Sequence, residues 1–236
     1  MHREIVLSGP GKNAMSTELM ERTRHELEDA QGAPVLLTGE GSAFSAGLDL
    51  REVIAADEDH LVDMLSALDA LIYALYTYPG PTVALVNGHA IAGGCVLALA
   101  CDHRVVADDP ALKVGLNETA NGLVFPPRVL ALVRARVPRH AVARVVLEGG
   151  LYAPDEARAL GLVDEVSKAP RATARARLEA LARHPSEVYA RNKLGLQNGS
   201  LAVEPDDDRR FREEGVPMWA SDETKARLSS LLRPRP

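Results

Sequence analysis

The 236-residue sequence lacks the features that mark several common protein classes. Its only cysteines, Cys95 and Cys101, both lie in one apolar run, so a disulfide framework of the secreted kind is excluded and two buried free thiols are expected. The two cysteines and the histidine and acidic residues near them are not arranged as in a metal site. The longest apolar run is too short to span a bilayer, and the N-terminal stretch has no apolar segment of signal-peptide length. We therefore expect a cytoplasmic protein without a membrane span.

Basic charge is also scarce. The chain has 27 Lys and Arg against 33 Asp and Glu, a formal net charge of −6, which argues against a nucleic-acid or anionic-membrane surface. No phosphate-binding Gly-x-x-x-x-Gly-Lys, no Gly-x-Gly-x-x-Gly and no Gly-x-Ser-x-Gly occurs. No internal repeat or low-complexity tract interrupts a composition that is ordinary for a globular protein. The sequence therefore predicts neither a nucleotide-cofactor fold nor a serine hydrolase.

Strand-like and helix-like segments alternate along the chain, which predicts an α/β fold. The expected strands cover residues 4–8, 33–39, 81–88, 103–109 and 161–166. One expected helix begins after a capping serine, Ser16. The others cover residues 59–78, 95–101, 127–136, 139–147, 153–160 and 172–181. An exposed charged helix is expected to start near residue 204.

Two of the expected strands run into turns that are rich in small residues. The first turn is "GEGSAFSAGLDL" at residues 39–50, and the second is "NGHAIAGGCVLAL" at residues 87–99. Small residues allow a ligand to approach main-chain N–H groups, and Gly93 and Gly94 precede a helix whose N-terminus offers further free donors. Two donors from separate turns would make an oxyanion hole. The alternative is that these glycines only allow tight packing of helix against strand.

The segments "AFSAGLDL", "NGHAIAGGCVLALACDHRVVA" and "APDEARALGLVDEV" resemble the crotonase, or enoyl-CoA hydratase/isomerase, superfamily. The resemblance implies a spiral of ββα units over residues 1–170, which would bind acyl-CoA. It also implies a helical region over residues 171–236 that mediates homotrimers, often paired into hexamers. No cofactor is implied, because coenzyme A is part of the substrate.

The same resemblance assigns roles to particular backbone and side-chain groups. The two oxyanion-hole N–H groups would be those of Ala46 and Gly93. The substrate-binding residues would be Ala46, Gly47, Leu48, Asp49, Leu50, Arg51, Gly93 and Asn117. Asp49 is expected to order its loop, and Arg51 to lie either near a CoA phosphate or in solvent. Weaker assignments give Lys193 a contact with CoA, and structural roles to His89, to an Asp102–Arg104 pair and to Phe211 and Trp219.

The choice of reaction depends on two positions. Hydratases of the family carry two glutamates, and the position of one of them is Val96 here. The other matches Glu118 in "GLNET", a motif that resembles the Δ3,Δ2-enoyl-CoA isomerases of the family. Valine cannot hold water, whereas a double-bond shift needs only one base that removes and returns a proton. The resemblance therefore implies an isomerase of unsaturated fatty-acid breakdown or of a related acyl-CoA pathway, with Glu118 as the proton shuttle and its pKa raised by an apolar pocket.

Two other functions stay open at the level of sequence. One is a weak or specialised hydratase, or another crotonase reaction that uses one carboxylate. The other is a subunit that binds acyl-CoA without catalysis. Turnover of a 3-enoyl-CoA separates both from the isomerase.

Overall fold

The computed structural model describes residues 2–232 and contains two parallel β-sheets. The larger sheet has the strand order β1-β2-β4-β6-β8, and the smaller one has the order β3-β5-β7. The strands are β1 Arg3–Leu7, β2 Val35–Gly39, β3 Ala43–Ser45, β4 Thr82–Val86, β5 His89–Ile91, β6 His103–Ala107, β7 Val114–Gly115 and β8 Glu165–Ser167. The chain therefore winds as a spiral, in which β2, β4 and β6 are each followed by one strand of the smaller sheet.

This winding is the predicted α/β spiral of ββα units. The helices are α1 Pro10–Asn13, α2 Thr17–Asp29, α3 Leu50–Ala55, α4 Glu58–Tyr76, α5 Gly93–Ala100, α6 Pro127–Arg136, α7 Arg139–Leu147, α8 Pro154–Ala159 and α9 Pro170–Ala182, with a 3₁₀ turn, η1, at Thr119–Asn121. Ser16 caps α2 as expected, because its side chain accepts a hydrogen bond from the N–H of Leu19. Among the helices between residues 2 and 232, none has both the length and the apolar character that crossing a membrane requires.

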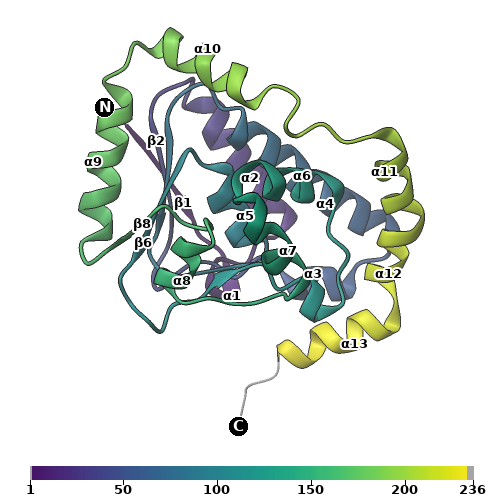
Figure 1. Ribbon diagram of the computed structural model, residues 1–236. Helices are drawn as coiled ribbons and strands as arrows, with labels where there is room; N and C mark the ends of the chain where they lie inside the picture. Colours follow the sequence, from purple (N-terminus) through teal and green to yellow (C-terminus); the bar gives the residue numbers. More distant parts are fainter. Residues whose placement is uncertain (1, 233–236) are drawn as a thin grey trace.

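The larger sheet is buried on both faces, as parallel sheets usually are. Successive side chains of a strand point to opposite faces. Leu36, Val83, Leu85 and Val105 form a small core with Ala174 and Leu178 of α9, whereas Leu37, Ala84, Val86 and Val106 belong to the main core. Figure 1 shows α9 along one side of this sheet and the stack of α2, α4 and α5 on the other.

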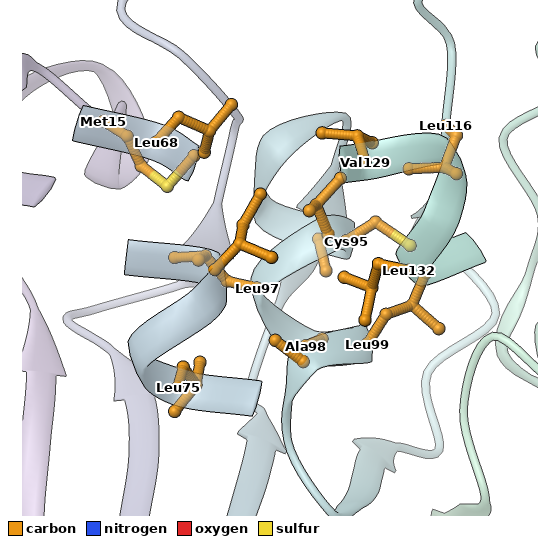
Figure 2. Close-up of a cluster of buried hydrophobic side chains, with 14 of the residues drawn as sticks. Met15, Leu68, Leu75, Cys95, Leu97, Ala98, Leu99, Leu116, Val129 and Leu132 are labelled. Carbon is orange, nitrogen blue, oxygen red and sulfur yellow. The ribbon is translucent and has the colours of Figure 1, made fainter. Parts of the chain in front are cut away.

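Helix α5 lies at the centre of the main core, and all eight of its residues are buried. In Figure 2, Cys95 and Leu99 lie on the side of Val129 and Leu132, while Leu97 lies on the side of Met15 and Leu68. Both cysteines are buried and free, as predicted. Because it is enclosed on all sides, α5 holds its N-terminus in a fixed place.

The C-terminal segment continues as α10 Ser186–Gln197, α11 Pro205–Arg210, the π-helical turn η2 Phe211–Gly215, α12 Val216–Ala220 and α13 Asp222–Leu231. In Figure 1 it passes over the sheet and then down the side opposite α9. Val216, Trp219 and Leu228 join the main core. The segment beyond residue 170 thus packs on the spiral of the same chain, and its expected role in oligomerisation stays a prediction.

The prediction that Asp102 pairs with Arg104 is wrong. Oδ2 of Asp102 accepts hydrogen bonds from Nζ of Lys193 at 2.8 Å and from the hydroxyl of Tyr189 at 2.9 Å, while Arg104 pairs with Asp164 at 2.5 Å. These partners come from α10 and from the segment before β8, so no local pattern reveals them. The side chain of Lys193 is only 6% exposed in this ion pair. It is therefore not available for the contact with CoA that the family resemblance implies.

Candidate active site

A cavity of about 100 Å³ lies where the three strands of the smaller sheet end. Its lining comprises Ala46, Leu48, Leu50, Val53, Leu68, Ile91, Ala92, Gly93, Val96, Asn117, Glu118, Asn121, Leu123, Pro126, Val129, Trp219, Leu228 and Leu231. The loops that follow β3, β5 and β7 all contribute. Ligand sites of α/β proteins commonly lie at the carboxyl ends of parallel strands, so we take this cavity as the candidate active site.

The turn after β3 approaches α5 through a glycine. Gly47 has a φ of +91°, and a Cβ atom at this position would lie 3.2 Å from the nitrogen of Gly93. The flanking backbone is held by Met15, whose N–H donates to the carbonyl of Gly47 at 2.8 Å and whose carbonyl accepts from the N–H of Asp49 at 3.0 Å. This arrangement fixes Leu48, the residue between Gly47 and Asp49, beside the N-terminus of α5.

The two turns converge, but not through Ala46. The N–H of Ala46 donates to the carbonyl of Lys12 at 3.1 Å, so it is already used within the fold. The N–H of Leu48 has no acceptor among residues 2–232, and its nitrogen would lie 3.6 Å from a Cβ atom placed on Gly93. The structure therefore corrects one predicted donor: Leu48, two residues further on, offers the free N–H that Ala46 does not.

The second donor is at the start of α5. Gly93 is the first residue of this helix, and its N–H likewise has no acceptor in the described part of the chain. The preceding residue, Ala92, has φ 51° and ψ −125°, a conformation that costs about 1–3 kcal/mol for a non-glycine residue. A hydrogen bond of 2.8 Å from the N–H of Ala92 to the carbonyl of Gly115 holds it there. Strain at this point turns the N-terminus of α5, with its partial positive charge, toward the cavity.

Glu118 supplies the acid–base group. It is 7% exposed, and its Oε2 has no hydrogen-bond partner among the described residues. Its main chain is fixed, because its carbonyl accepts from the N–H groups of Asn121 and Leu123, both at 2.9 Å. Burial among mostly apolar side chains raises the pKa of Glu118 to about 7, the direction that the sequence predicts. A carboxyl group with this pKa can accept and release a proton near neutral pH.

The rest of the lining is poor in acid–base groups. Val96 lies one turn into α5 and is 1% exposed, so the described lining contains one acidic side chain, that of Glu118. The Oδ1 atom of Asn117 is buried and has no partner in the described chain. Between residues 2 and 232, no three His, Cys, Asp or Glu side chains lie close enough to hold a metal ion. The site is therefore built for chemistry by one carboxyl group and backbone donors.

The remaining predicted residues lie around this centre. Leu50 lines the cavity, whereas Asp49 caps α3 by accepting from the N–H of Arg51 at 2.9 Å, and so orders its loop as expected. Arg51 is exposed on α3 and does not line the cavity. His89 has the predicted structural role, because its Nδ1 accepts from the N–H of Lys113 and so ties β5 to the segment before β7.

The C-terminal helices provide a part of the site that the sequence does not reveal. Trp219 of α12 and Leu228 of α13 are buried and line the cavity. The indole Nε1–H of Trp219 donates to the carbonyl of Val124 at 2.9 Å, which fixes the ring. These residues arrive from about a hundred positions downstream of Glu118, so no local spacing could have linked them to it.

Comparisons with known proteins agree with this geometry. The family model described as enoyl-CoA hydratase/isomerase matches residues 3–205. A Thermus thermophilus protein named "Putative enoyl-CoA hydratase" is 41% identical over 213 residues, which cover 85% of this chain and 82% of that protein. The mouse "Enoyl-CoA delta isomerase 1, mitochondrial" is 36% identical over 167 residues, which cover 69% of this chain and 58% of that protein.

Solved structures point in the same direction. The crystal structure of human mitochondrial delta3-delta2-enoyl-CoA isomerase superposes with a TM-score of 0.89 at 27% identity, covering 97% of this chain and 92% of the other. An enoyl-CoA hydratase from Bacillus halodurans, 23% identical with a TM-score of 0.83, shares the fold. From the matched family model, the relatives and the common fold, the chain belongs to the enoyl-CoA hydratase/isomerase family.

Proposed function

We propose that the protein is an isomerase that converts cis- or trans-3-enoyl-CoA to trans-2-enoyl-CoA. The observation that carries the proposal is the composition of the cavity: one buried carboxyl group, Glu118, shares it with two free backbone donors, and Val96 occupies the position of a second carboxylate. The names of the mouse and human isomerase relatives support the same reaction.

In the proposed mechanism, the thioester oxygen of the substrate accepts hydrogen bonds from the N–H groups of Leu48 and Gly93. Glu118 removes a proton from C2, and the electron pair of that C–H bond moves into the thioester to give a dienolate. As the carbonyl re-forms, the double bond moves to C2–C3 and C4 takes the proton back from Glu118. Each backbone donor lowers the barrier by about 3–4 kcal/mol, because it stabilises charge that is greatest on the oxygen of the dienolate.

A second candidate is a weak hydratase. It is favoured by the name of the Thermus thermophilus relative, and the unpaired Oδ1 of Asn117 is a group that could accept a hydrogen bond from water. Against it, hydration requires a base that holds and activates water as well as an acid for C2. The methyl groups of Val96 can form no hydrogen bond. We therefore expect hydration to be slow relative to isomerisation.

The test supplies trans-3-hexenoyl-CoA to the purified protein and follows the absorbance of the conjugated product. A parallel reaction with crotonyl-CoA measures formation of 3-hydroxybutyryl-CoA. Rapid conjugation with little hydration is the expected result. Faster hydration than isomerisation would favour the hydratase, and binding of both thioesters without turnover would indicate the non-catalytic acyl-CoA-binding subunit.

The assembly expected from the family is a homotrimer or a hexamer made of two trimers. Light scattering coupled to size-exclusion chromatography measures the mass in solution directly. A mass of three or six chains of 25.3 kDa is expected, and a monomer would contradict the proposal.

A further inference from the structure

Part of the cavity wall is a layer of buried apolar side chains. The same cavity holds Leu48, Gly93 and Glu118, where the thioester would react. Leu68 of α4 and Trp219 of α12, which are 4% and 3% exposed, belong to this layer together with Pro126. Because the cavity has a volume of only about 100 Å³, an acyl chain whose thioester lies at the two N–H donors would soon meet this wall.

A second, larger cavity has a volume of about 460 Å³. It is lined by Leu65 and Val216, which precede Leu68 and Trp219 by one helical turn on α4 and α12. Pro126 lines both cavities. The same three segments thus border the two spaces, so the two cavities are neighbours.

Trp219 is the least movable part of that layer. Its Nε1–H donates to the carbonyl of Val124 at 2.9 Å, and the ring belongs to the main core. Rotation of the indole out of the way would break this hydrogen bond and leave its buried donor unpaired. Leu68 has no polar group to hold it, so the tryptophan decides how far an acyl chain can reach.

We infer that Trp219 ends the acyl-binding site and restricts the enzyme to short-chain acyl-CoA. This inference rests on the proposed function, because it takes the cavity to be the acyl site. A chain that extends as far as the indole meets a closed wall, although the neighbouring cavity has space for several more methylene groups. Replacing Trp219 by a smaller side chain would join the two cavities and admit longer substrates.

The first experiment compares trans-3-hexenoyl-CoA with trans-3-dodecenoyl-CoA as substrates of the wild-type protein. We expect kcat/KM to be at least about tenfold higher for the hexenoyl substrate, a ratio of the size that steric limits in apolar pockets produce. Calorimetric binding of hexanoyl-CoA and dodecanoyl-CoA measures the same preference without turnover. If no substrate turns over, the proposed function fails, and the binding ratio still decides the inference.

The second experiment changes the wall. Trp219→Leu should raise the dodecenoyl-to-hexenoyl ratio by about tenfold, and Trp219→Phe should raise it less. Adding Val216→Trp to Trp219→Leu refills the larger cavity and should lower the ratio again. Met218→Ala, which alters a half-exposed neighbour on the same helix, should leave the ratio as in the wild type.

Folding is checked by circular dichroism, and Trp219→Phe provides the milder change if Trp219→Leu is unstable. The inference is overturned if the wild type uses or binds both chain lengths equally. It is also overturned if a folded Trp219 variant keeps the wild-type ratio, because another residue must then limit the chain.

Discussion

Replacing Glu118 by glutamine should slow isomerisation by orders of magnitude and stabilise the protein at the same time. Glutamine keeps the shape of the side chain but cannot take a proton from C2, so kcat/KM should fall by about 10²–10⁴-fold. The stability should change in the opposite direction, because the native protein must bury a carboxylate that has no hydrogen-bond partner for Oε2 in the described chain.

The size of the stabilisation follows from the pKa of Glu118. Its pKa is about 7 in the folded protein against an ordinary value of 4.5, and a tenfold change in the protonation equilibrium corresponds to about 1.4 kcal/mol. Burial of the charged form therefore costs on the order of 3 kcal/mol. Below about pH 4.5 both the folded and the unfolded chain carry the proton, so the cost is absent. It grows as the pH rises from about 4.5 to about 7, since only the unfolded chain has then released its proton.

Urea unfolding of the wild type and of Glu118→Gln, at about pH 5 and about pH 8, measures this effect. The advantage of the variant should grow by about 2–3 kcal/mol between these two conditions. Glu179→Gln, a matched change at an exposed residue of α9, should show no such growth. In the wild type, kcat/KM should rise with pH through about pH 7, because only the ionised carboxyl group can remove the C2 proton.

Two results would refute this reasoning. If Glu118→Gln isomerises 3-hexenoyl-CoA at the wild-type rate, Glu118 is not the proton shuttle. If the variant loses activity but its stability relative to the wild type does not change with pH, the carboxyl group is not desolvated in the native protein, and the explanation for its pKa fails.

The remaining predictions concern the oxyanion hole and the anchor of α10. Gly93→Ala places a methyl group 2.5 Å from Cε of Met15 and beside the proposed hole, so kcat/KM should fall by about 10²-fold or more. Gly195→Ala adds a methyl group that meets no atom of residues 2–232 within 4 Å outside its own helix backbone and its chain neighbours, so it should keep full activity and add about 0.5–1 kcal/mol of stability. Lys193→Met leaves the carboxylate of Asp102, which is only 12% exposed, without its cation, so urea unfolding should show a loss of about 3–5 kcal/mol. A loss below about 1 kcal/mol would show that the other donors to Asp102 suffice.

The long elements could be predicted from the sequence because their signals are local. Residues 127–136 and 139–147 were expected to be helical and form α6 and α7 with the same limits. A proline at the first helical position and a periodic apolar face mark α6 without any knowledge of its partners. The buried strands β2 and β4 were likewise visible as short apolar runs that end at or near glycine.

The parts that build the site were harder to predict, because they depend on contacts between distant segments. Strands β3, β5 and β7 have only two or three residues, too few for a periodic pattern, yet their ends carry the donors and Glu118. The choice between Ala46 and Leu48 depends on the carbonyl of Lys12, which occupies one N–H and leaves the other free. Glu118 itself was identified through the family resemblance and not from its surroundings in the sequence.

Val96 explains two properties of the site at once. An apolar residue one turn into α5 removes the group that would hold water for hydration, and it also contributes to the dry surroundings that raise the pKa of Glu118. A second carboxylate at this position would bring a like charge into the same cavity, which would raise the pKa of one of the pair further and couple the two titrations. Valine at position 96 therefore has two effects. It removes a group that would bind water, and it leaves Glu118 as a single base whose pKa is near neutral pH. If the proposed function is correct, the absence of a carboxylate at position 96 of α5 is as important for the choice of reaction as the presence of Glu118 just before η1.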